Sequence, residues 1–93
     1  MSTTIQYPLL HSHYFLEFGI YDVELNCAIE PENARQIIRD IIQKTNVDDF
    51  AYIGNSQFVM IIDVLAKRKG PVHYEEIESI LNNYCSSFDI RRR

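Results

Sequence analysis

The sequence predicts a single α+β domain in which two helices cover one face of an antiparallel sheet, in the order ββαββα. Three patterns predict it: period-two alternation that starts at residue 14, a helical apolar stripe over residues 31–45, and a turn at residues 54–56 between two apolar segments. A chain of 93 residues has room for one core of this kind. We expect an extended arm at residues 1–12, the α+β domain at residues 13–90 and a basic tail at residues 91–93.

The first two strands are predicted from a change of parity. Even positions are largely apolar over residues 14–20, whereas odd positions are apolar over residues 21–29. A straight strand cannot change parity in this way, because successive side chains point to opposite faces of the sheet. The change therefore indicates a hairpin turn or a bulge near Gly19–Asp22, where Gly19 tolerates the positive φ that such features need. We expect two antiparallel strands.

Both helices are predicted from apolar residues at helical spacing. The first begins at Pro31, where the missing N–H costs little, and runs to about residue 45. The second runs from about His73 to Phe88, after a loop that contains Gly70.

The segment from Gln57 to Leu65 is unusually apolar, with Asp63 as its only charged residue. It follows the strand-like segment from Phe50 to Ile53 across Gly54-Asn55-Ser56, so the two segments predict a hairpin. Two helices can cover only one face of the sheet, and an apolar opposite face would mark an interaction surface. We therefore expect a homodimer or another protein partner, with the interface at Val59, Ile61 and Leu65.

The net charge of −4 is distributed unevenly. Residues 13–50 carry eight acids and three bases, whereas residues 51–93 carry five acids and six bases. A general nucleic-acid binder usually has a basic domain, so this balance does not favour that class. Two alternatives stay open: a nucleic-acid or phosphate-binding regulator that uses the basic loop and tail, and a small acidic inhibitor of a basic protein. The candidate phosphate contacts are Lys67, Arg68, Lys69, Arg91 and Arg92.

Few residues are arranged for chemistry. In an extended strand His11 and His13 would lie ~6.6–6.8 Å apart, but Glu17 would be ~13 Å beyond His13, and a catalytic zinc site needs three protein ligands. We interpret the histidines as part of a solvated strand edge, His73 as a local structural residue, and Asp48 with its neighbour as a solvated turn. The sequence contains no GxSxG, HExxH or CxxC motif. We expect no catalytic residue, no metal and no cofactor.

The cysteines and the N-terminal segment bear on location. Cys27 and Cys85 are the only cysteines, and we interpret them as reduced, buried thiols. The first residues lack the pattern of a secretory signal, and no segment is long and apolar enough to span a bilayer. We expect a cytoplasmic protein without a membrane partner.

One stretch resembles a known family. From Ile41 to Phe88 the sequence reads IIQKTNVDDFAYIGNSQFVMIIDVLAKRKGPVHYEEIESILNNYCSSF, a helix end, a hairpin, a long apolar strand, a glycine-containing loop and a final helix. This succession resembles the second half of YbjN-like and type III secretion chaperone-like domains, and the upstream segment YFLEFGIYDVELNCAIEP is similar to their preceding strands. The chain lacks their long N-terminal helix. The resemblance implies a non-catalytic, often dimeric protein-binding role, either chaperone-like or as a regulatory adaptor.

Overall fold

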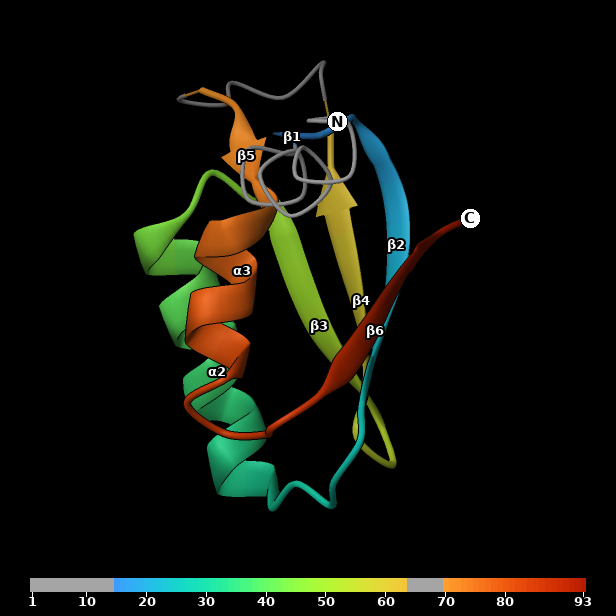
Figure 1. The fold of residues 1–93 in the computed structure, drawn as a ribbon, viewed down its shortest axis with the longest axis vertical. Coiled ribbons are helices and arrows are strands. Elements are labelled where there is room, and N and C mark those ends of the chain that lie inside the picture. The colour runs from blue at the N-terminus through green and yellow to red at the C-terminus, as the bar shows by residue number, and fades with distance from the viewer. Residues whose placement is uncertain (1–14, 64–69) are drawn as a thin grey trace, which may run out of the picture.

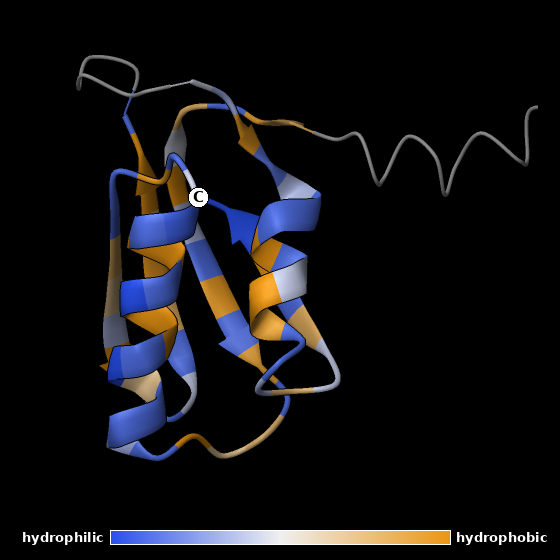
Figure 2. Cartoon of the chain, turned by 90° about the vertical axis from the view of Figure 1, so that its left-hand side faces the viewer, coloured by the Kyte–Doolittle hydropathy of each residue, from blue (hydrophilic) through white to orange (hydrophobic). Residues whose placement is uncertain are grey.

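A computed structural model of the chain describes residues 15–63 and 70–93. It confirms the α+β fold, with helices α2 (Pro31–Lys44) and α3 (Tyr74–Leu81) packed side by side on one face of a sheet (Figures 1 and 2). The sheet consists of β2 (Gly19–Leu25), β3 (Asp49–Gly54), β4 (Gln57–Ile62) and β6 (Phe88–Arg92). Its strand order is β3-β4-β2-β6, and all neighbours are antiparallel.

The parity change marks a break between two sheets. Strand β1 (Phe15–Leu16) pairs with β5 (Val72–His73) in a separate two-stranded sheet, so the expected antiparallel pairing of the first two strands is wrong. The chain bends before β2, which begins at Gly19 with a φ of 150°. The expected role of Gly19 is confirmed, because this backbone conformation is one that other residues rarely adopt.

Helix α2 forms as the sequence predicts. Pro31 lies in its first turn, and Ala34, Ile37 and Ile41 are buried against the sheet. The helix ends at Lys44, and the hydroxyl of the capping residue Thr45 donates a hydrogen bond to the carbonyl oxygen of Ile41 at 2.6 Å. The same carbonyl oxygen also accepts the backbone N–H of Thr45 at 3.1 Å, so both polar groups of Thr45 close the last turn of the helix. In the described ranges, 15–63 and 70–93, no helix is long and apolar enough to cross a bilayer.

Helix α3 is shorter than predicted, because it ends at Leu81 and a turn follows. Apolar residues continue at helical spacing beyond that point, and Cys85 is buried while Tyr84 packs against the core, but neither is in the helix. The prediction that residues 91–93 form a tail outside the domain is also wrong. Residues 88–92 form β6, an edge strand paired with β2. The last residue, Arg93, donates its N–H to the carbonyl oxygen of Ile20 at 2.8 Å.

The core lies between the helices and the sheet. Phe58, Met60 and Ile62 of β4 are each at most 1% exposed, so the even-numbered residues of this strand face the helices. Phe50 on β3 stacks on Phe58 with 5.0 Å between ring centroids. Figure 2 shows both helices in front of the sheet, with hydrophobic and hydrophilic segments alternating along each helix. The odd-numbered residues of β4 therefore lie on the opposite face.

Candidate functional site

The sheet face opposite the helices carries exposed apolar side chains. Ile53 on β3 is 62% exposed and Ile20 on β2 is 41% exposed, whereas Val59 and Ile61 on β4 are half-buried. The register makes these residues neighbours, since Ile61 lies opposite Ile20 and Val59 lies opposite Ala51. Among the described residues, both helices lie on the other side (Figure 1). We call this set the open-face patch: Ile20, Ala51, Ile53, Val59 and Ile61.

Charged residues border the open-face patch along β2 and β6. Asp22 lies opposite Val59 on one side and Arg91 on the other, and Glu24 lies opposite Asp89. Asp22 accepts a bidentate hydrogen bond from Arg93, with Nη2 to Oδ1 at 2.9 Å and Nε to Oδ2 at 3.1 Å. The hydrogen bond from Arg93 lowers the pKa of the Asp22 carboxyl, and the carboxylate raises the pKa of Arg93. The border therefore contains fixed charges of both signs.

A shallow groove joins the patch to its border. It has a volume of about 330 Å³, with Ile53 and Val59 on the apolar side and Asp22, Arg91 and Arg93 on the charged side. Such a groove has both features of a protein interface, an apolar centre and a polar rim.

The structure places two of the three predicted interface residues, Val59 and Ile61, on this open face. The third, Leu65, lies outside the described residues. The sequence reasoning missed Ile20 and Ile53, which are the two exposed large apolar residues of the patch. Alternation within Phe50–Ile53 would have found Ile53, because Phe50 is buried and Ile53 lies three positions further along the strand, on the opposite face.

The predicted phosphate contacts are only partly described, since Lys67, Arg68 and Lys69 lie outside the described residues. Arg91 and Arg92 are adjacent in β6, so their side chains leave the sheet on opposite faces. Arg92 contacts the carboxylate of Glu17, with Nη1 and Oε1 3.4 Å apart. Neither the separation of the two guanidinium groups nor this carboxylate favours a shared phosphate site.

The candidate metal ligands can be placed only in part. His11 and His13 lie outside the described residues, and the part of the chain that the structure describes contains no group of three potential ligands. His73 has the structural role expected of it, because its N–H donates to Glu76 Oε1 at 3.3 Å and its ring contacts Phe15. Asp48 accepts a hydrogen bond from the N–H of Asp63.

No protein-family model, curated protein or solved structure matches this chain. The resemblance to YbjN-like and type III secretion chaperone-like domains therefore stays a prediction, and the surface itself carries the functional argument.

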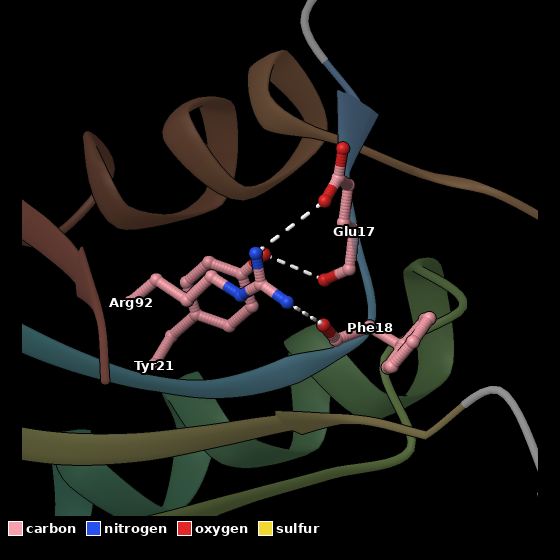
Figure 3. Close-up of polar contacts among 4 residues, drawn as sticks. All are labelled: Glu17, Phe18, Tyr21 and Arg92. Carbon is pink, nitrogen blue, oxygen red and sulfur yellow. Dashed lines mark hydrogen bonds and ion pairs between the residues drawn. The ribbon is translucent and has the colours of Figure 1, made fainter.

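Arg92 links β6 to the bend before β2 by hydrogen bonds. Figure 3 shows its guanidinium reaching the bend, where Nη2 donates to the carbonyl oxygen of Phe18 at 2.9 Å. The carbonyl oxygen of Glu17 accepts a hydrogen bond from the Tyr21 hydroxyl at 2.5 Å, also drawn there. These bonds fix the start of β2, and hence the position of Ile20 in the open-face patch.

Replacement of Gly19 by alanine is expected to lower the free energy of unfolding by about 1–3 kcal/mol. The φ of 150° strains any residue with a Cβ, and a Cβ at this position would lie 2.8 Å from Nε of Arg92. Urea titration measures the loss. Gly54→Ala is the matched control, because Gly54 also has a positive φ of 131° but has no atom within 4 Å of the added Cβ.

A double-mutant cycle separates two causes of the stability loss in Gly19→Ala, crowding by Arg92 and backbone strain at positive φ. Gly19→Ala is expected to cost less stability in an Arg92→Ala background than in the wild type, because the crowding atom is gone. An equal cost in both backgrounds would show that Arg92 does not restrict this position.

Proposed function

We propose that this protein is a non-catalytic protein-interaction module that self-associates through the open-face patch. The observation that carries the proposal is the exposure of Ile20 and Ile53 beside Val59 and Ile61 on one sheet face. Exposed apolar patches on small domains usually mark interaction surfaces, because their contact with water is unfavourable.

The chemistry of the border supports a second copy of this chain as the occupant. A two-fold interface brings the same surface from both subunits together, so each charge must find its opposite on an identical surface. The border provides both signs, with Asp22 and Glu24 beside Arg91 and Arg93. A partner of strongly positive or strongly negative charge would match only half of it.

The size of the face sets the expected affinity. With four strands ~4.8 Å apart and six residues in β4 at ~3.3 Å each, the face measures roughly 15–20 Å by 20 Å. That footprint is well below the roughly 800 Å² per partner of a standard protein interface. We expect a weak, concentration-dependent dimer in which the sheets pack about 10 Å apart.

Sedimentation velocity over a wide concentration range tests the proposal. The wild-type chain is expected to shift from monomer to dimer as its concentration rises, and Ile53→Lys or Val59→Lys is expected to abolish the shift by placing an ammonium in the interface. The matched control is Ile42→Lys, because Ile42 is 38% exposed but lies on α2, on the other side of the molecule. It should leave the dimer intact.

Two results would contradict the proposal. One is a wild-type chain that stays monomeric up to roughly millimolar concentration, where even a weak dimer would form. The other is a dimer that Ile42→Lys dissociates and the two sheet variants do not. Circular dichroism of each variant establishes that a lost dimer is not a lost fold.

A further inference from the structure

The two cysteines of the chain meet at one end of the sheet. Half-buried Cys27 follows β2, and buried Cys85 follows α3. The β2–β6 ladder brings these two segments together, since Leu25 lies opposite Phe88 at its end. One residue further along, Asn26 donates its N–H to the carbonyl oxygen of Ser87 at 3.0 Å. The loops that carry the cysteines are thus held side by side by the backbone.

Both thiols lie at the junction of these two segments. The Sγ of Cys27 lies 3.7 Å from the carbonyl oxygen of Tyr84, the residue before Cys85. The Sγ of Cys85 lies 3.3 Å from the carbonyl oxygen of Ser87. The Cys85 side chain is close enough to the Cys27 thiol to shift its pKa. A disulfide needs close Cβ atoms. The two cysteines lie on adjacent, backbone-bonded segments, with Cys27 Sγ against the residue before Cys85, so they are placed to form one.

The environments of the two thiols differ. The hydrogen bond with Cys85, together with burial, raises the pKa of the Cys27 thiol. Burial alone would raise the pKa of Cys85 as well, but the hydrogen bond with Cys27 and backbone hydrogen bonds with Ser87, Asn26 and Ser86 lower it below its ordinary value. The buried Cys85 thiol therefore ionises more readily, and the more exposed Cys27 thiol is easier for a reagent to reach.

We propose that Cys27 and Cys85 form a redox-modification site, which a small disulfide of the glutathione type converts to an intramolecular disulfide. Cys27 loses its proton to water and attacks one sulfur of the small disulfide, whose S–S bond breaks and releases one thiolate. The Cys85 thiolate then attacks the Cys27 sulfur of this mixed disulfide and releases the second small thiolate. The protein loses two electrons and two protons, and the small disulfide becomes two thiols.

The cysteine pair does not provide enough ligands for a metal ion. Two thiols supply half of a tetrahedral zinc site, and residues 15–63 and 70–93 provide no group of three His, Cys, Asp or Glu side chains to complete one.

The disulfide would cross-link loops that are almost sixty residues apart in the sequence. Closing a loop of this length restricts the unfolded chain, so the oxidised protein is expected to melt roughly 10 °C or more above the reduced protein. Dithiothreitol should reverse the shift.

Intact-mass spectrometry of the full chain after incubation with glutathione disulfide tests the proposal. The expected product has lost two hydrogen atoms and carries no glutathione, and its melting temperature is raised. The Cys85→Ala variant should instead keep one glutathione on Cys27, because the resolving thiol is missing. The Cys27→Ala variant should stay unmodified while folded, because Cys85 is only 6% exposed.

Three results would overturn the proposal: a wild-type product that retains glutathione, a covalent dimer on a non-reducing gel, or two thiols that stay free under conditions that modify Cys27 in Cys85→Ala. If Cys85→Ala fails to fold, the wild-type mass and its melting shift still decide the matter, since both are measured on the native chain.

Discussion

A chain that ends at Ser87 is expected to lose cooperative folding. The truncation removes β6, which pairs with β2 from Leu25 to Tyr21. It also removes Phe88 and Ile90, which pack against the core, and the Arg92 side chain that holds the bend before β2. The free energy of unfolding of a domain of this size is only about 5–10 kcal/mol. The combined loss of an edge strand and two apolar side chains is expected to exceed it.

Thermal melting followed by circular dichroism measures this effect, and the truncated chain should show no sigmoidal transition. The control is a chain that ends at Arg92, which loses the exposed ion pair between Arg93 and Asp22 and one backbone hydrogen bond. Exposed ion pairs contribute little, so it should melt within a few degrees of the full chain. Similar melting of both truncated chains would show that β6 is dispensable.

Replacement of Phe58 by alanine is expected to lower the free energy of unfolding by about 3–5 kcal/mol. Its ring is 1% exposed, stacks on Phe50 and packs against Tyr52, so its removal leaves a cavity between sheet and helices. The adjacent Val59 is the matched control, because it lies in the same strand on the open face and is only half-buried. Val59→Ala should cost less than about 1 kcal/mol in the monomer.

Urea titration at low protein concentration compares the two variants, since dilution removes any contribution from self-association. Equal losses at Phe58 and Val59 would mean that both faces of β4 are equally enclosed, which contradicts an open sheet face. The comparison thus tests the assignment of faces as well as the core.

The elements that are predictable from sequence are those whose pattern is local. Helix α2 has a proline start and buried apolar residues at helical spacing, and the β3–β4 hairpin has a Gly-Asn-Ser turn between apolar strands. In that turn Asn55 and Ser56 adopt positive φ, which short hairpin connections require.

The elements that were missed depend on distant partners. Residues 88–92 alternate apolar Phe88 and Ile90 with charged residues, which is a strand pattern, but it is short and follows apolar residues at helical spacing. Only the free edge of β2 makes it a strand. The pairing of β1 with β5 is likewise a tertiary choice, because the parity change indicates a break but not where the separated strand goes.

The candidate surface was also predictable only where it depends on local sequence. Val59 and Ile61 were expected on the uncovered face if the even-numbered residues of β4 faced the helices, and Phe58, Met60 and Ile62 do so. Ile20 belongs to the patch because the chain bends at residues 17–19 and β2 starts at Gly19, which fixes its face only after the bend is known. The proximity of Cys27 and Cys85 could not be predicted from the sequence, because it depends on the β2–β6 ladder.

The position of β2 between β4 and β6 also bears on the order in which the chain folds. The β3–β4 hairpin closes across a two-residue turn, whereas β2 and β6 are separated by roughly 60–70 residues, and long loops cost more entropy to close. Non-local strand pairings also form slowly. The central strand therefore acquires its second neighbour late, and until then its free edge offers unpaired backbone groups to other chains. The period before β6 docks is thus when the protein is most exposed to aggregation.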